Sequence, residues 1–576
     1  MGDHAVTERD ELTLRVLGAL LREDVLGLRT ASVPVERADG RWLRLELSGT
    51  AVLLPVADEG FQCEHTARLP LLEVDGARVT GLDEMIGSLR ALAAPEDRAG
   101  YDAFAEECRQ TLATMRLHAG ARDGVHAELA ARYGADPADW TGLRGSLAED
   151  TLAAYHDHPV YPTARGRRGL DDENLRRYAP EFHPSFPLRW LAVPREALTT
   201  HGDAPLPAWW PTPRQLGLPD PTGHRLAIPV HPLSIGEGLE EALAATALGG
   251  RAVLAERPYL TVVPTLSMRT VAVVETPLHH LKLPLATATL GRRNRRTIKP
   301  GVLPDGAAGQ RLLEAVIARE PRFAHSVLLA DEQWYAETGH ELLAVLLRRY
   351  PATLQDALTV PLAALLAAAP GGRLVIDHLA DRFFRGDVLA LYDSLLAVLL
   401  DWHTTLFGYG IALESHQQNT SLVLDLPHGR TRLRLLLKDN DGPRINTVRS
   451  ALLDVKPDDF TDPRICGTDD RPLTDLFTTI TGHLCTAAVA FGLAAHGRAS
   501  LTGLLRLLRD RLDEAIGRLG ADGEPMRAAL LDAERLPVKA MVTAGTLLSK
   551  ERSGAADVNK YYTSGPNYLL RAGVRR

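Results

Sequence analysis

Apolar and polar residues follow two different periods in the first quarter of this chain. Residues 8–30 and 99–134 repeat apolar positions every three or four residues, which predicts helices. Between them, "RWLRLELSGTAVLLPVA" at 41–57 alternates with a period of two and predicts strands. We therefore expect an N-terminal mixed α/β unit over residues 1–150, with no evident chemistry of its own.

The residue pattern changes after residue 150, where prolines become frequent and short apolar runs end in polar clusters. Three such runs are "RLAIPVHP" at 225–232, "YLTVVPTLSMRTVAV" at 259–273 and "HHLKLPLATATL" at 279–290. Loops and strand ends are common positions for binding groups. The pattern predicts a β-rich central unit over 151–340 that carries a site.

The pattern from 341 to 576 is mostly helical. Helix is predicted for "HELLAVLLRRY" (340–350), "VPLAALLAAA" (360–369) and "VLALYDSLLAVLLDWHTTLF" (388–407), and "GYG" at 408–410 ends the last of them. Two strand-like segments follow, "IALESHQQNTSLVLDL" and "TRLRLLLKDNDGPRI", before further helices. The predicted fold class is α+β, with a helical C-terminal unit.

Composition narrows the function classes. The formal net charge is −8, which argues against a nucleic-acid partner. The four cysteines form no CxxC pair and are expected to be reduced. The N-terminus lacks a basic region before an apolar stretch, so no signal peptide is predicted. No uninterrupted apolar run reaches about 18 residues, so we expect a cytoplasmic protein without a membrane partner.

The stretch "ALESHQQN" at 412–419 places a row of polar residues between two apolar runs. In a strand, Glu414, His416 and Gln418 would share one face, with Asn419 at the strand end. Polar side chains beside a core need partners or a ligand. The alternatives are a ligand site, a buried polar network or a hairpin edge.

The second strand-like segment ends in Lys438 and Asp439, with Asp441 and Gly442 beyond. A carboxylate at a strand end beside a polar hairpin partner is a recurrent way to hold Mg²⁺ on nucleotide phosphates. An Asp-Asn-Asp-Gly turn explains the same residues as backbone structure. The two interpretations are compatible.

A third group of residues could hold phosphate. Ser267 and Arg269 would share a strand face, and Lys282 follows thirteen residues later. Further hydroxyls and cations come next: Thr287, Thr289, Arg292, Arg293, Arg295 and Arg296. There is no P-loop sequence. The group predicts a triphosphate cradle, against the alternative of exposed strand polar groups.

The fourth group lies in the loop "DHPVYPTARGRRG" at 157–169, which two prolines stiffen. It would present His158, Thr163, Arg165 and Arg167 to a ligand.

Taken in order, these stretches resemble the IucA/IucC family, siderophore synthetases that work without a nonribosomal peptide synthetase. The family loop reads roughly G-H-P-x-H-P-x-x-K-x-R-x-G; here Tyr161 and Arg165 depart from it. "LSMRT", "LESHQQN", "LPVKAM" at 536–541 and the Gly-Pro-Asn at 565–567 look family-like. Lys438 stands where the family usually has Arg, while Asp439 matches. The resemblance spans about 155–570.

The resemblance implies an ATP-dependent ligase with Mg²⁺. Citrate or a related acid would form an acyl-adenylate, and an amine or alcohol would then displace AMP. It also implies a cupped-hand architecture of thumb, fingers and palm with mainly antiparallel sheets, and often a homodimer.

The resemblance assigns roles to the residues singled out above. Phosphate contacts are expected from Ser267, Arg269, Lys282, Thr289, His416 and one of Arg293 or Arg296. Glu414, Gln418, Asn419 and Asp439 would serve the nucleotide, with Glu414 and Asp439 as metal ligands. His158, Thr163, Arg165, Arg167 and Arg444 would face the acid or the triphosphate. Two rivals stay open: an ADP-forming phosphotransferase, and a non-catalytic protein that binds citrate-like or ferric-chelate anions.

Overall fold

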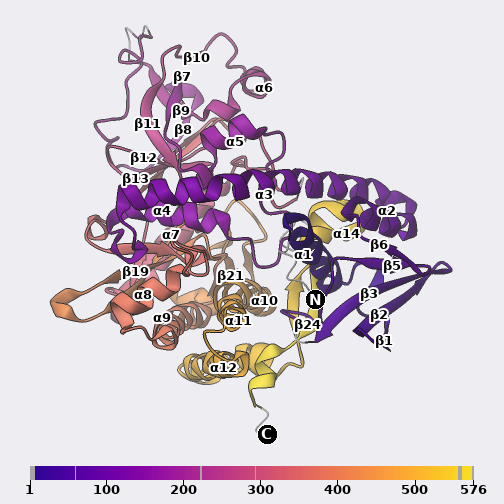
Figure 1. Ribbon diagram of the computed structural model, residues 1–576. Helices are drawn as coiled ribbons and strands as arrows, with labels where there is room; N and C mark the ends of the chain where they lie inside the picture. Colours follow the sequence, from indigo (N-terminus) through magenta and orange to yellow (C-terminus); the bar gives the residue numbers. More distant parts are fainter. Residues whose placement is uncertain are drawn as a thin grey trace.

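The computed structural model describes residues 7–58, 60–218, 220, 223–291, 293–554 and 561–573. Its N-terminal unit contains two short helices, one very long helix and a six-stranded antiparallel sheet (Figure 1). The helices are α1 (Glu8–Arg22), α2 (Leu82–Leu92) and α3 (Arg98–Tyr133). The strands are β1 (Val33–Arg37), β2 (Gly40–Leu47), β3 (Thr50–Asp58), β4 (His65–Ala67), β5 (Leu72–Val74) and β6 (Ala77–Val79). Both expected helices and the expected strands are present.

A nine-stranded antiparallel sheet forms the centre of the chain, in the order β10-β7-β11-β12-β13-β16-β15-β8, with β9 beside β7. Its strands are β7 (Phe186–Pro194), β8 (Thr199–His201), β9 (Arg225–Val230), β10 (Val253–Leu254), β11 (Tyr259–Pro264), β12 (Thr270–Val273), β13 (His279–Lys282), β15 (Asp331–Glu337) and β16 (Ala344–Arg349). The α4 helix (Gly142–Tyr155) leads into this part of the chain. The central sheet thus extends beyond residue 340.

Two predicted helices are wrong. Residues 340–350 contain β16, and 360–369 contain the end of β17 (Leu358–Pro361) followed by a 3₁₀ turn, Leu362–Ala364. Short apolar runs that are buried on both sides give no periodicity to separate strand from helix. Tertiary burial decided these two cases.

The C-terminal part combines a four-stranded sheet with long helices. The sheet has the order β14-β20-β19-β17, in which β14 (Val327–Leu329) pairs in parallel with β20 (Arg432–Leu437), and β19 (Thr420–Asp425) forms a hairpin with β20. The helices are α7 (Val302–Arg319), α8 (Val375–Phe384), α9 (Val388–Gly408), α10 (Arg471–Phe477), α11 (Ala488–Ala495) and α12 (Leu501–Gly517). Two small sheets pair β18 (Ile411–Ala412), β21 (Arg444–Asn446) and β22 (Cys466–Gly467), and β23 (Arg535–Lys539) with β24 (Tyr562–Pro566). The expected mixture of helices and mainly antiparallel sheets is confirmed.

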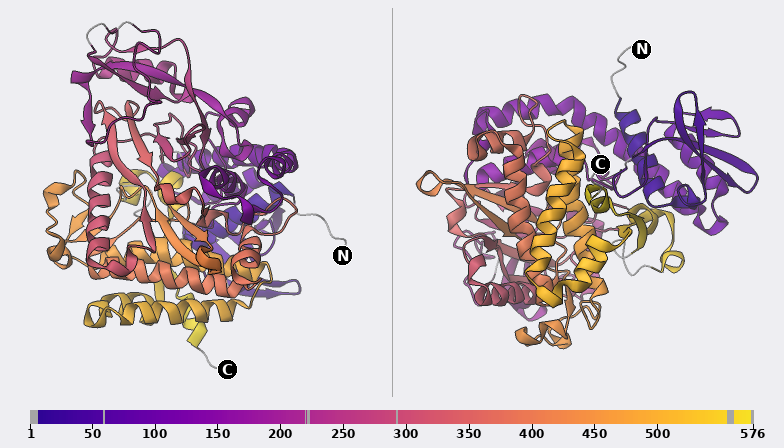
Figure 2. Two further views of the ribbon diagram at one scale, coloured as in Figure 1. Left: turned by 90° about the vertical axis from the view of Figure 1, so that its left-hand side faces the viewer. Right: turned by 90° about the horizontal axis from the view of Figure 1, so that it is seen from below.

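The long helices of the C-terminal half lie side by side when the molecule is seen from below (Figure 2). The predicted α9 is correct, and Tyr392, Trp402 and all of its leucines except the exposed Leu389 are buried in the largest apolar core. One helical run of the described chain, Arg471–Ala495, is long and apolar enough to cross a membrane, but 83% of its apolar window is buried inside the protein. Its composition is thus that of a core helix.

Candidate active site

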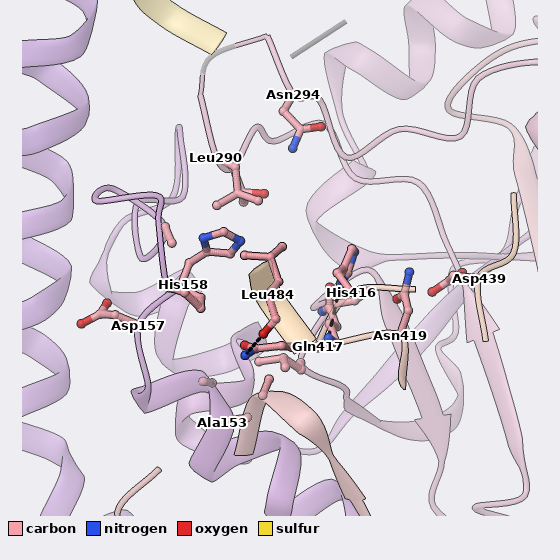
Figure 3. A pocket seen from close by; sticks show the side chains of 18 of the residues that line it. Ala153, Asp157, His158, Leu290, Asn294, His416, Gln417, Asn419, Asp439 and Leu484 are labelled. Carbon is pink, nitrogen blue, oxygen red and sulfur yellow. Dashed lines mark hydrogen bonds between the residues drawn. The ribbon is translucent and has the colours of Figure 1, made fainter. Parts of the chain in front are cut away.

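A cavity of about 350 Å³ collects loops and strand ends that are far apart in the sequence. In Figure 3, His158 faces the segment that carries His416 and Asn419, with Asp439 farther along and Asn294 on another side. The predicted site residues that line the cavity are His158, Arg165, Arg167, Ser267, Arg269, Lys282, Thr289, Arg296, Glu414, His416, Gln418, Asn419 and Asp439. The separate sequence patterns therefore meet in one place.

The polar row at 412–419 is not a strand, so its predicted strand face is wrong. Strand β18 ends at Ala412 and β19 begins at Thr420, and the residues between form an irregular segment and a turn. The turn is closed by the Asn419 amide, which donates to the His416 carbonyl at 2.8 Å. A strand would turn alternate side chains away, whereas this turn lets the consecutive residues 416–419 all reach the cavity.

Ser267 and Arg269 also lie in a turn, between β11 and β12, and not on the predicted strand face. Met268 between them adopts a left-handed φ of 63°, which reverses the chain. The Ser267 hydroxyl accepts a hydrogen bond from the Thr270 amide at 3.1 Å. The Arg269 guanidinium donates to the Thr297 carbonyl at 2.8 Å. Both side chains are thus anchored by backbone groups before any ligand arrives.

Two arginines of the cavity have no anionic partner. Within the described ranges, neither Arg269 nor Arg296 forms an ion pair with a carboxylate. Burial, followed by the nearby cations Arg269 and Arg167, lowers the pKa of Arg296 to about 9. Buried charges are normally paired. Cations held together in this way indicate a site for an anion.

Lys282 and Asp439 form the polar end of the cavity. The Lys282 ammonium lies 2.7 Å from Asp439 Oδ1 and 2.9 Å from Asp441 Oδ2. Asp439 Oδ1 is also 2.7 Å from Nη2 of the buried Arg348. Burial opposes ionisation of Asp439, but attraction by Arg348 and Lys282 outweighs it and holds the pKa of this carboxyl well below its usual range. Asp439 is therefore an anion shared by two cations.

Two of the histidines that line the cavity, His158 and His416, are neutral donors at neutral pH. Burial lowers the pKa of His158 to about 3, and it also lowers the pKa of His416. The Nδ1 of His158 accepts from the Tyr161 amide at 3.0 Å, and that of His416 accepts from the Gln418 amide at 3.3 Å. The proton of each neutral ring is consequently on Nε2, which can donate to a ligand oxygen.

The arginines of the 157–169 loop have partners already. Arg165 Nε lies 2.8 Å from Asp157 Oδ1, and Arg167 Nη2 lies 2.8 Å from Glu181 Oε1. Both arginines line the cavity, but each already forms an ion pair with a carboxylate of the protein. These ion pairs hold the loop and thereby fix the shape of the site.

Three predicted residues do not line the cavity. The Thr163 hydroxyl donates to Glu107 at 3.4 Å, and the Arg444 guanidinium donates to the carbonyl of the preceding Pro443 at 3.0 Å. Arg293 donates to the Ala544 carbonyl at 2.8 Å. Of Arg293 and Arg296, between which the sequence left the choice open, Arg296 lines the cavity. Arg292 lies outside the described residues.

No group of three or more His, Cys, Asp or Glu side chains that could hold a metal ion occurs in the described part of the chain. Asp439 and Asp441 nevertheless converge on one point, which the Lys282 ammonium occupies. Mg²⁺ in nucleotide sites is commonly bound by one or two carboxylates together with waters and phosphate oxygens. The donor set fits Mg²⁺ that arrives with a nucleotide.

Comparison with known proteins agrees with the motif pattern. The model of the IucA / IucC family matches residues 149–367, and that of the "Ferric iron reductase FhuF-like transporter" family matches residues 393–553. Staphyloferrin B synthase of Staphylococcus aureus is 25% identical over 462 residues, which are 74% of this chain and 76% of that protein. Rhizobactin siderophore biosynthesis protein RhbC of Rhizobium meliloti is 26% identical, over 77% of this chain and 79% of its own. Residues 149–367 of this chain thus match the IucA / IucC family, and the chain as a whole is similar to named siderophore synthases.

Solved structures of two siderophore biosynthesis proteins share the fold. ATP-bound aerobactin synthetase IucA from Klebsiella pneumoniae superposes with a TM-score of 0.71 at 19% identity, covering 97% of this chain and 99% of that one. Petrobactin biosynthesis protein AsbB from Bacillus anthracis gives a TM-score of 0.74 at 17% identity, covering 98% and 96%. At these identities the likeness concerns the fold alone.

Sequence reasoning missed several lining residues. Lys539 lies 3.4 Å from Glu414 Oε1, and Asp441 and Asn294 also reach the cavity. Lys539 stands inside the family-like stretch "LPVKAM", which was a usable signal. Asp441 was assigned to a turn, and Asn294 is hidden among the arginines that surround it.

The N-terminal unit also contributes, although none of its described residues lines the cavity. The Arg15 guanidinium donates to the Tyr161 carbonyl at 3.1 Å, and that of Arg22 donates to the Val160 carbonyl. The Glu23 carboxylate accepts from the amides of Val542 and Thr543 at 3.0 and 2.8 Å. Helix α1 therefore holds both the His158 loop and the segment just after Lys539.

Proposed function

We propose that this protein is an ATP-dependent ligase of siderophore-type biosynthesis. It activates citrate or a related polycarboxylic acid as an acyl-adenylate and joins the acyl group to an amine or alcohol. The observation that carries the proposal is the convergence of Ser267, Arg269, Lys282, Arg296 and His416 in one cavity. Unpaired guanidinium groups beside neutral N–H donors suit a bound phosphate chain.

The reaction balances in two displacements. A carboxylate oxygen of the acid attacks the α-phosphorus of ATP, and pyrophosphate leaves with the electrons of the broken P–O bond. The amine or alcohol then attacks the acyl carbon, loses a proton and displaces AMP. Negative charge gathers around the α-phosphate in the first step. Hydrogen-bond donors that are already fixed around the α-phosphate stabilise this transition state most strongly, and removing one typically lowers the rate by about 10²–10³.

Each end of the cavity has a proposed task. Arg269, Lys282 and Asp439 would hold the triphosphate with Mg²⁺, which when bound neutralises phosphate charge. Glu414 is the second metal carboxylate suggested by the sequence, and Asp441 is added because it shares Lys282 with Asp439.

The neutral donor His158 and the Lys539 cation, which lies beside Glu414, would contact the carboxylates of the acid. Thr289 also lines the cavity, and its hydroxyl adds a donor there. Gln418 and Asn419, on the turn beside His416, would contact the nucleotide.

Named relatives support the choice of substrates. A segment of L-2,3-diaminopropanoate--citrate ligase of Staphylococcus aureus is 39% identical over 62 residues, and one of aerobactin synthase of Escherichia coli is 41% identical over 68 residues. We accordingly expect a citrate-like acid and an amine-bearing partner. We place the reaction in the cytoplasm, where ATP is available, and expect a homodimer, to be checked by light scattering.

The deciding experiment offers ATP, Mg²⁺ and a panel of carboxylic acids crossed with amines and alcohols, and identifies the nucleotide product. Acid-dependent release of pyrophosphate and AMP supports the ligase. ADP as the product would establish the phosphotransferase instead. Tight binding of citrate or a ferric chelate without any nucleotide turnover would favour the non-catalytic binding protein.

A further inference from the structure

Behind the polar end of the cavity lies a buried ion pair that does not line it. Glu332 on β15 and Arg348 on β16 have side chains that are 5% and 1% exposed. Their charged groups are in contact through Arg348 Nε and Glu332 Oε1. A buried ion pair is weak evidence for stability, because desolvation offsets much of its attraction. The contacts that Glu332 and Arg348 make with Asp439 give this ion pair another role.

An irregularity in the sheet directs Glu332 inward. The register pairs Asp331 with Arg349 and Trp334 with Leu347, so three steps along β15 correspond to two along β16. One extra residue is therefore accommodated on β15 next to Glu332, as in a β-bulge, which re-aims a side chain. The neighbours Asp331 and Arg349 form a looser pair, 3.6 Å apart, with side chains 43% and 19% exposed.

The buried pair holds Asp439 at two points. Both carboxylate oxygens of Glu332 accept the Asp439 amide at 3.1 Å, while Arg348 Nη2 lies 2.7 Å from Asp439 Oδ1. Asp439 has a left-handed φ of 54°, which is uncommon for a residue other than glycine. The ion pair thus fixes both the strained backbone and the carboxylate of this residue.

The two cations on Asp439 differ in where they can go. Lys282 lines the cavity and is shared with Asp441, so its ammonium can turn toward a bound phosphate. Arg348 is enclosed in the sheet and stays with Asp439. If Lys282 leaves, Arg348 and Glu332 are the contacts that keep the carboxylate in place.

We propose that Glu332 and Arg348 are positioning residues that hold Asp439 for the Mg²⁺ of a bound nucleotide. This inference rests on the proposed function, because it assigns Asp439 to the metal–phosphate end of that site. Neither residue touches substrate. Outer contacts of this kind orient a ligating carboxylate, and their loss typically lowers metal affinity about 10- to 100-fold.

The test measures metal binding directly. Glu332→Gln and Arg348→Met are compared with wild type in Mn²⁺ titrations followed by electron paramagnetic resonance, with a non-hydrolysable ATP analogue present. We expect Mn²⁺ affinity to fall about 10- to 100-fold. The metal concentration for half-maximal pyrophosphate release should rise in parallel, while KM for the acid stays near the wild-type value. Asp331→Asn and Arg349→Met, on the same strands, are the matched controls and should behave like wild type.

The results of this test distinguish the positioning role of Glu332 and Arg348 from the proposed ligase activity. Folded Glu332→Gln protein that binds Mn²⁺ as wild type does would overturn it, and so would an acid KM that rises as much as the metal requirement. If Arg348→Met does not fold, Arg348→Lys takes its place, since lysine keeps the charge but lacks the separate nitrogens that contact Glu332 and Asp439. Weakened Mn²⁺ binding in variants of a protein that releases no pyrophosphate would support the positioning role and reject the ligase.

Discussion

Replacing Lys282 with methionine removes one charge from the polar end of the cavity and keeps most of the side-chain volume. In the structure the Lys282 side chain is 3% exposed, and its ammonium lies within 3 Å of two carboxylates, those of Asp439 and Asp441. The substitution therefore separates two roles of the lysine: balancing these anions in the folded protein, and contacting phosphate during the reaction.

The expected loss of stability is moderate. Asp439 keeps Arg348 at 2.7 Å, and Asp441, whose side chain is 32% exposed, can be hydrated. A buried charge left with no partner costs roughly 3–5 kcal/mol, whereas a polar group that loses one of several partners costs about 1–3 kcal/mol. We expect the lower range for Lys282→Met.

The expected loss of activity is larger. A fixed cationic donor to the developing charge contributes about 10²–10³ in rate, which corresponds to about 3–4 kcal/mol of transition-state stabilisation. The fall should appear in kcat/KM for ATP-dependent pyrophosphate release, measured at saturating acid. Urea unfolding of the same samples gives the stability change.

Lys299→Met is the control, because Lys299 is exposed and does not line the cavity. A folded Lys282→Met protein with pyrophosphate release close to that of Lys299→Met would refute the reasoning. So would a loss of activity that disappears once the unfolded fraction is corrected for, since the lysine would then serve stability alone.

Three further predictions concern other parts of the molecule. Arg296→Ala should lower kcat/KM about 100-fold. Arg293→Ala, which loses contacts to backbone carbonyls, should lower the melting temperature and leave kcat/KM nearly unchanged. Equal losses of kcat/KM in the two variants would contradict the placement of Arg296, but not Arg293, in the cavity. Burial lowers the pKa of His231 from 6.5 to about 3, so between those values the unfolded chain binds a proton that the folded chain rejects, and stability falls as pH drops. His231→Gln should reduce that acid slope in urea titrations by about 1.4 kcal/mol per pH unit, and an unchanged slope would reject the assignment. Glu23→Gln should destabilise the protein by about 1–3 kcal/mol and raise KM for the acid through Lys539; unchanged KM in folded protein would limit Glu23 to a structural role.

Sequence determined the features that depend on local pattern or on residue chemistry. Helices α3 and α9 follow from long apolar periodicity, and the β19–β20 hairpin follows from two apolar runs around a turn. The residue types of the site could also be selected, because cations, hydroxyls and histidines interrupt apolar runs where a core would exclude them. Their order along the chain was enough to indicate the resemblance to the IucA/IucC family, whose model matches residues 149–367.

Only the tertiary structure decided what depends on neighbours distant in sequence. Residues 344–349 became a strand because the sheet buries them on both sides. Arg296 faces the cavity while Arg293 contacts backbone carbonyls near the C-terminus, a choice that spacing within one loop does not encode. Glu332 and Arg348 gain their importance from Asp439, roughly a hundred residues away in sequence, since long-range contacts follow from chain packing and leave no local period to read.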